Sequence, residues 1–432
     1  MKTVISFILF LFACVSTAFA QLTLDECRQK AKENYPLIKK RQLIEQSKAY
    51  DLSNAAKAWL PQFQMNVKAA YQSDVTKIPI DFSQLSALGI PISNIPTPTR
   101  DQYQATLEAS QVLWDGGAVR SQKKLTKAGS EVEQTQLEVE IYALEEQVNR
   151  LFFGILLLDE QLKQNQLLTD ELQRNFMTVH SYVANGIANQ SDLDVIKVEQ
   201  LNAGQLRTQL QSSRKAFTEM LGRMIGDELG KNTSFVKPDP ADNVRTNLTR
   251  SPLINRPELE LFESQNALFD SQKSLIQSAA MPKLGLFLQG GYGRPGLNML
   301  SDKFDSFYIG GVRLSWNFGA LYTQANDLRK IEINKSTVNT QKELFLYNID
   351  LAVSRENREI ERLQNLMRDD DEIIRLRESI RQSVEAKVAN GAATVTDLMR
   401  ELTQENLARQ TKAVHEIDLL SAIYNLKNTT NN

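Results

Sequence analysis

The sequence predicts a mainly α-helical protein with a small contribution of membrane β-strands, built from a helix–strand–strand–helix unit that occurs twice. Three observations predict this fold class. Landmarks of the first half recur in order in the second half, two stretches of equal length carry a heptad pattern, and four short segments alternate apolar and polar residues.

The duplication rests on four pairs of landmarks. Val-Ala-Asn-Gly at 183–186 recurs at 388–391, and Asp-Leu follows both, so the glycine and the aspartate are each displaced by 205 residues (391 − 186 and 397 − 192). Three looser pairs are Tyr35-Pro36 with Arg256-Pro257, Trp59-Leu60-Pro61 with Met281-Pro282, and Trp114-Asp115-Gly116-Gly117 with Trp316-Asn317-Phe318-Gly319. Four matches in order indicate an internal repeat rather than two unrelated Asn-Gly turns.

The repeat divides the chain into a first copy at 21–230 and a second copy at 253–432. Residues 231–252 lack a clear period and are interpreted as an equatorial segment between the copies, lying against the side of the helical bundle.

Residues 116–185 and 319–388 are predicted to form long helices, each of 70 residues. Their apolar residues are spaced alternately by four and three, as in a coiled coil. Such a helix is ~105 Å long at 1.5 Å per residue. Four charged residues interrupt the second seam: Glu356, Asp370, Arg377 and Arg381. Helices of about half that length are expected near 22–57, 190–222, 251–279 and 394–425, so that two stacked short helices match one long helix.

Four segments are predicted to be strands: about 59–77, 100–114, 282–293 and 306–318. In each, apolar residues such as Phe63, Met65 and Val67 alternate with mostly polar neighbours, over roughly the ~9–11 residues of a tilted membrane strand. Breaker-rich loops at about 78–100 and 291–305 join them in pairs. The second loop begins Gly-Tyr-Gly-Arg-Pro-Gly, which matches a dinucleotide fingerprint formally, but Pro295 and the flanking strands favour a hairpin.

The three tryptophans, Trp59, Trp114 and Trp316, all fall where a strand is expected to meet a helix. Amphipathic rings gather at membrane interfaces, which makes these residues candidate interface aromatics; the alternative is three ordinary core residues. After the N-terminus no segment approaches the ~18 apolar residues of a membrane helix, so a membrane crossing would require strands.

The N-terminus is predicted to be a secretory signal peptide at 1–20. Lys2 precedes an apolar run that ends at Ala18-Phe19-Ala20, so the mature chain would begin near Gln21. The alternative is a lipoprotein signal in which Cys14 is lipidated. Only Cys27 remains in the mature chain, which excludes an internal disulfide.

Composition argues against several function classes. The mature net charge is −3 (49 − 52), with no basic excess for nucleic acid. With two histidines and no nearby cysteine, we expect no metal site, no cofactor and no enzymatic activity. The acidic run at 369–372 is interpreted as a solvated face rather than a cation site. No P-loop is present, so energy would come from a partner.

Four strands cannot close a barrel, and open edges in lipid leave backbone groups unpaired. Two copies would give eight strands with a filled interior, and three would give twelve, so a pore favours three or more copies. In such a ring the helices would form a hollow cylinder.

The duplicated plan, the Trp-Asp-Gly-Gly junction and the twin Asn-Gly…Asp-Leu turns resemble the TolC-like outer-membrane efflux family, across essentially the whole mature chain. The resemblance implies a homotrimer with a twelve-stranded barrel in the outer membrane and a coiled-coil tunnel in the periplasm, where most of the chain would lie. It implies a passive conduit for tripartite efflux or type I secretion, recruited by a periplasmic adaptor (membrane fusion protein) and an inner-membrane pump or ABC exporter.

By this resemblance, the turns at Asn185-Gly186 and Asn390-Gly391, within about 183–192 and 388–397, are the periplasmic tips that dock the adaptor. The candidate gate residues are Asp192, Asp397 and Arg400. Arg400 stands where the best-known members carry a second acid, and Ala393 where they carry an arginine. Whether Arg400 pairs with Asp192 or Asp397 stays open, and helix capping is the alternative role of both aspartates.

The rival interpretation is a periplasmic coiled-coil adaptor or structural protein of an export complex. It would share the long helices. It would not explain paired amphipathic strands with tryptophans at their ends.

Overall fold

The computed structural model describes residues 21–76, 98–230, 233–239 and 253–431. The predicted signal peptide, Cys14, most of the first strand-joining loop and most of the inter-repeat segment lie outside these residues. The chain forms two compact units. Unit 1 comprises residues 1–41, 135–261 and 341–432, and unit 2 comprises residues 42–134 and 262–340.

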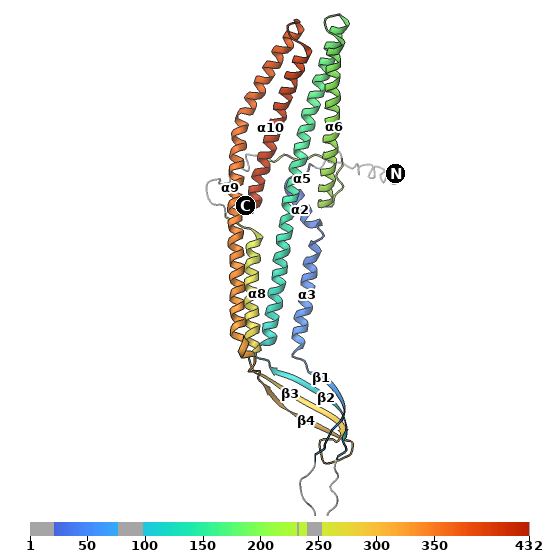
Figure 1. Cartoon of the computed structure of the whole chain (residues 1–432), viewed down its shortest axis with the longest axis vertical. Helices are drawn as coiled ribbons and strands as arrows, with labels where there is room; N and C mark the ends of the chain where they lie inside the picture. Colours follow the sequence, from blue (N-terminus) through green and yellow to red (C-terminus); the bar gives the residue numbers. More distant parts are fainter. Residues whose placement is uncertain (1–20, 77–97, 231–232, 240–252, 432) are drawn as a thin grey trace, which may run out of the picture. The chain divides into compact units, whose positions relative to one another are not determined.

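Two very long helices confirm the heptad prediction. They are α5 (Ala118–Ala184, 67 residues) and α9 (Ala320–Ala389, 70 residues). Each is followed by a helix of 36 residues, α6 (Gln190–Ile225) and α10 (Val395–Thr430), and Figure 1 shows each pair joined by a tight turn. None of the helices that the structure describes is both long and apolar enough to cross a membrane.

The remaining helices include one correction. The stretch 22–57 does not form one helix but two, α2 (Leu24–Asn34) and α3 (Ile38–Lys57). The break falls at Tyr35, whose ψ of 127° is extended, because the ring of Pro36 excludes the helical conformation from the residue before it. The predicted helix before the third strand is α8 (Pro257–Ala279).

The core of unit 1 gathers around α5. Its fully buried members include Phe152 of α5, Leu221 of α6 and Leu420 of α10, joined by Cys27 and Ala31 of α2. Burial raises the pKa of the Cys27 thiol to about 12, so the side chain packs as a small apolar group.

The start of the described chain is tied to this core by a short parallel bridge. Leu22 donates its N–H to the carbonyl of Ser234 and accepts from Val236, both at 3.0 Å, and Phe235 meets the ring of Phe152 edge-on at 5.7 Å. Residues 233–239 thereby pack against the core of unit 1, to which they belong.

Two of the charged residues that interrupt the second heptad seam are buried and have local partners. Glu356 and Asp370 are only 8% and 5% exposed. Asp370 lies 2.8 Å from Nδ1 of His415 on α10, and Glu356 pairs with the neighbouring Arg355. A buried carboxylate needs such a partner because desolvation penalises an unpaired charge.

Unit 2 contains the sheet, a four-stranded antiparallel ribbon in the order β1-β2-β3-β4. Its strands are β1 (Gln62–Tyr71), β2 (Asp101–Trp114), β3 (Lys283–Arg294) and β4 (Asp305–Ser315), drawn together in Figure 1. The four strand predictions are confirmed, with β1 shorter than expected. The two copies meet where β2 pairs with β3.

The register places most of the large apolar residues of the four strands on one face. Met65 lies opposite Leu107, which lies opposite Gly290 and then Tyr308. The large side chains of this face are exposed, reaching 72% at Val67 and 78% at Tyr308. A contiguous exposed apolar face of this kind marks a surface that meets lipid or protein.

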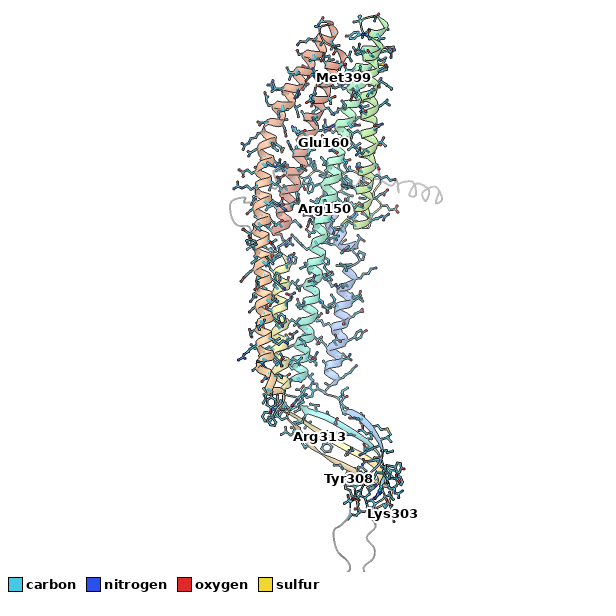
Figure 2. All side chains as sticks on the ribbon, viewed as in Figure 1. Arg150, Glu160, Lys303, Tyr308, Arg313 and Met399 are labelled. Atoms are coloured by element: carbon cyan, nitrogen blue, oxygen red, sulfur yellow. The ribbon has the colours of Figure 1, made fainter. Side chains whose placement is uncertain are left out.

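The opposite face is polar on β1 and β2 but mixed on β3 and β4. Glu108 and Arg313 form a salt bridge of 3.1 Å there, and Figure 2 labels Arg313 on β4. Phe287 and Phe307 occupy the same face, with the ring of Phe307 lying where a Cβ on Gly291 would stand. The glycines of the second copy therefore provide space for aromatic rings.

The junction from β2 to α5 explains the Trp-Asp-Gly-Gly motif. Asp115 is buried and accepts the N–H groups of Gly117 (2.8 Å) and Val119 (2.6 Å), which caps the start of α5. Gly116 and Gly117 have φ of +68° and +85°. This left-handed region favours glycine.

These two adjacent glycines allow a matched test of packing. Both would be strained by a Cβ, at about 1–2 kcal/mol. A Cβ at Gly116 would also stand 2.4 Å from Cβ of Met281, whereas Gly117 has open space. We expect Gly116→Ala to lower the thermal unfolding temperature clearly more than Gly117→Ala, measured by circular dichroism. Equal shifts would show that the positive φ alone, and not the contact with Met281, requires glycine at position 116.

Candidate functional site: helix turns and strand ends

The two helix turns have the same geometry, as their shared sequence predicts. In the first turn (185–189) Gly186 has φ of +73°, and Ile187 donates its N–H to the carbonyl of Tyr182 at 2.8 Å. In the second turn (390–394) Gly391 has φ of +69°, and Ala392 makes the equivalent 2.8 Å bond to Lys387. Each is a glycine-terminated helix end that satisfies the last carbonyls.

The asparagine before each glycine closes the same helix end. Asn185 donates its side-chain amide to the carbonyl of Ser181 at 2.8 Å, and Asn390 donates to Ala386 at 2.7 Å. The turns differ in the next exposed side chain. Ile187 is 66% exposed, whereas the second turn has the small Ala392. The first turn thus offers an apolar side chain that the second lacks.

Asp192 and Asp397 cap the helices that follow the turns. Asp192 accepts the N–H of Asn189 at 2.9 Å. Asp397 accepts the N–H and the hydroxyl of Thr394 at 3.1 and 2.7 Å, while Thr394 accepts the N–H of Asp397. Both are reciprocal capping boxes. Both aspartates therefore cap a helix, and a role at the gate would be additional.

Arg400 pairs with Asp397 and not with Asp192 in the described structure. Its guanidinium lies 3.2 Å from Asp397 and 3.3 Å from Glu401, and its side chain is 63% exposed. Hydrogen bonds from Thr394, and then the charge of Arg400, hold the pKa of Asp397 below its ordinary value. Asp397 therefore stays ionised at neutral pH.

A second charge cluster lies farther from the turn at 390–394, on the side of the helices. Arg381 joins three carboxylates: Glu405 of α10 at 2.7 Å, Glu385 at 2.9 Å and Glu171 of α5 at 3.4 Å. Glu405 is 7% exposed and also pairs with Arg409 at 2.8 Å. The sequence marked Arg381 only as an interruption of the heptad. Its partners Glu171 and Glu405 could not be identified from the sequence, because they lie on two other helices.

The hydrophobic contacts beneath the turns hold α5, α6 and α10 together. Leu172 and Val179 of α5 pack with Ile196 of α6 and with Leu398 and Met399 of α10 in one cluster. Figure 2 labels Met399 on α10 close to the turn. Asp397 and Arg400 therefore lie on a helix whose apolar residues are held in place by contacts with α5 and α6.

The three tryptophans stand at strand ends, as predicted, and they are not core residues. Trp59 precedes β1, Trp114 ends β2 and Trp316 follows β4. They are 40%, 46% and 49% exposed, so the core alternative is wrong. Trp316 donates its indole N–H to the carbonyl of Ala280 at 3.0 Å, and its ring packs against that of Phe318 with the centroids 4.6 Å apart.

No metal site is formed by the described residues, where no group of three or more His, Cys, Asp or Glu side chains is arranged to hold an ion. Members of the acidic run at 369–372 are paired instead. Asp370 meets His415, Asp371 meets Lys412 at 2.5 Å, and Glu372 meets Arg375 at 2.6 Å.

Comparison with known proteins agrees with this geometry. Residues 27–227 match the sequence model of the outer membrane efflux protein family. No curated protein sequence matches the chain.

Solved channels share the fold. The chain matches CusC with a TM-score of 0.70 at 14% identity, over 95% of this chain and 92% of that one. It matches the outer-membrane channel CmeC of Campylobacter jejuni with a TM-score of 0.64 at 12% identity, over 94% and 85%. It matches the open state of the outer-membrane channel MtrE of Neisseria gonorrhoeae with a TM-score of 0.64 at 14% identity, over 94% and 88%.

The chain has the fold of solved outer-membrane channels, and its residues 27–227 match the outer membrane efflux protein family. The likeness to solved channels shows the shared architecture, and the family match covers the first copy of the repeat, residues 27–227. The resemblance to the TolC-like family drawn from the residues is confirmed.

The cap of α10 gives a pH-dependent prediction. Because its folded pKa is depressed, Asp397 stabilises the helix start above its unfolded pKa of about 3.9, and this contribution is lost as pH falls through the lower folded value. We expect Asp397→Asn to speed amide hydrogen exchange in residues 395–399 at pH 7, measured by mass spectrometry. Asp371→Asn, which removes an exposed carboxylate that caps no helix, is the control. Equal exchange in both variants would contradict the capping role.

Proposed function

We propose that the chain is one protomer of a homotrimer that forms a passive export conduit through the outer membrane. A periplasmic adaptor and an inner-membrane pump or ABC exporter would recruit it and supply the energy. The observation that carries the proposal is the sheet, whose apolar face is exposed on all four strands and whose outer strands β1 and β4 each have one unpaired edge in the described chain.

Closure of the sheet needs further copies. Each unpaired edge presents backbone donors and acceptors that lipid cannot satisfy, at several kcal/mol per group. Pairing β4 of one protomer with β1 of the next satisfies both edges with one repeated interface. Three copies give twelve strands, which leaves more interior room than an eight-stranded barrel.

Exposed apolar residues on the helices support the same assembly. Leu43 and Tyr50 of α3 are 62% and 70% exposed, and Ile333 and Tyr347 of α9 are 63% and 62% exposed. Large apolar side chains repeated along helices are costly in water, so neighbouring protomers are their expected cover. The soluble-adaptor alternative would leave the apolar sheet face without a function.

The helix turns are the proposed docking points for the adaptor. Asn185-Gly186 and Asn390-Gly391 end the coiled coils, and they are exposed and backbone-rigid. Ile187 adds an exposed apolar side chain at the first turn only. An adaptor hairpin could therefore distinguish the two turns of each protomer by apolar contact.

Asp192, Asp397 and Arg400 are the proposed gate residues. Three copies of Arg400 beside Asp397 would place alternating charges around the constriction at the end of the tunnel. In this proposal the carboxylate and guanidinium partly neutralise each other, and the exposed part of Arg400 faces passing ions. The tryptophans would mark the interface of the membrane.

The proposal is tested by the state of the native protein. We expect the chain in the outer-membrane fraction, and we expect light scattering after mild detergent extraction to give three times the mass of one mature chain. A soluble periplasmic monomer or dimer would refute the conduit and favour the adaptor alternative. A membrane protein of two copies would refute the trimer alone.

A gate role for Arg400 predicts a change in ion selectivity. Arg400→Ala removes three positive charges per trimer while Asp397 stays ionised, so we expect a shift of the reversal potential toward cation selectivity in planar bilayers under a salt gradient. Arg375→Ala is the matched control, because it also breaks an i,i+3 ion pair, with Glu372, but lies away from the turn. An unchanged potential in Arg400→Ala would remove this residue from the gate.

A further inference from the structure

A basic hollow opens at the start of α5 in unit 2. It has a volume of about 410 Å³ and is lined by Trp59, Val119 and four cations. These cations, the basic cluster, are Arg120, Lys123, Lys124 and Lys127. Their spacing of three and four residues places them on one face of the helix.

The charge of the basic cluster is not balanced by ion pairs within the described residues. In the described part of the protein, none of its four members is in a salt bridge. The first turn of α5 contains no acidic residue, and Asp115 before it is engaged with backbone N–H groups. Like charges three and four residues apart repel, and cations near a helix start oppose the helix dipole. The arrangement therefore favours an anion from outside.

The second copy of the repeat shows that the helix does not require this charge. With the tryptophan offset of 202 (316 − 114), the four positions correspond to Tyr322, Ala325, Asn326 and Arg329 of α9. Only one of them is basic, although α9 also starts directly after a strand. A cation farther along α9 has a partner, since Lys335 lies 2.9 Å from Asp270. The unbalanced cluster is a property of the first copy.

The surroundings of the hollow indicate what kind of anion binds. Trp59 lines it, is 40% exposed and lies three residues before β1, whose alternate side chains form part of the exposed apolar face. An indole beside lysines, next to the end of a lipid-facing strand, is the arrangement found at the level of lipid headgroups. Guanidinium and ammonium groups are the usual ligands of phosphate.

We propose that this hollow binds the phosphate of an anionic phospholipid in the periplasmic leaflet of the outer membrane. The proposal rests on the proposed function, because it requires the sheet to lie in a membrane. The basic cluster holds the phosphate, and Trp59 packs beside the glycerol and the upper acyl chain. The bound lipid fixes how deep each protomer lies in the membrane at the junction of β2 and α5.

The test uses the full-length trimer extracted from membranes in mild detergent. Phosphatidylglycerol or phosphatidylcholine is titrated in, and bound lipid is counted by native mass spectrometry. We expect a preference for phosphatidylglycerol that falls on the order of 100-fold in the triple variant Lys123→Gln, Lys124→Gln, Lys127→Gln, because each lysine contributes about fivefold near an anionic surface.

Two further variants make the result specific. The triple variant Lys39→Gln, Arg207→Gln, Arg368→Gln removes the same charge from exposed positions of unit 1 and should keep the preference. Replacing the three cluster lysines by arginine should also keep it. If the glutamine variant fails to assemble, this arginine variant and the single Lys124→Gln variant, with an expected loss of about fivefold, still decide the question.

Several outcomes would overturn the proposal. One is an equal affinity for both lipids in the unmodified trimer, and another is an unchanged preference in the glutamine variant. If the glutamine variant loses the trimer but keeps its preference for phosphatidylglycerol, the cluster binds carboxylates of a second copy instead. If inorganic phosphate competes with phosphatidylglycerol at equal concentration, the site binds a free anion instead. If the unmodified chain is not extracted from the membrane as a trimer, that result contradicts the proposed function and not the lipid site.

Discussion

Backbone groups in lipid must be paired, and four strands in one chain cannot pair them all. The sheet of unit 2 is fully bonded inside, through β1-β2, β2-β3 and β3-β4, and open only at its two outer edges. Exposure of its apolar face to water is unfavourable. In lipid, a single chain would leave the backbone groups of the two outer edges without hydrogen bonds, which is also unfavourable. The proposed assembly of three copies resolves this conflict, and in that assembly the helices share the symmetry of the strands.

The duplicated unit supplies the pairing inside the chain. Because β2 belongs to the first copy and β3 to the second, the central strand pair of the sheet is itself the contact between copies. The same duplication gives two helix turns with matching glycine angles and matching capping boxes. Where the copies diverge, at Ile187 against Ala392 and at the basic cluster, the divergence identifies positions that local folding does not require.

Charges buried in the coiled coils are the other departure from a simple pattern. A heptad seam of apolar residues would pack well without Asp370 or Glu405, yet both are buried and paired across helices. Paired buried charges add little net stability but strongly disfavour any arrangement that separates them. Arg381, which contacts α5 and α10 from α9, therefore restricts how these three helices can move near the turns.

The sequence by itself determined the elements, because their signals are periodic and local. Heptads gave α5 and α9, alternation gave the strands, and Asn-Gly followed by Asp gave the turns with their caps. Only the break at Tyr35 was missed among these, although Pro36 signalled it. The tertiary structure alone decided the strand register, the partner of Arg400, the cluster around Arg381 and the hollow beside Trp59. Apart from the local pair of Arg400 with Asp397, these features depend on side chains that are far apart in the chain, and no local period records which of them will meet.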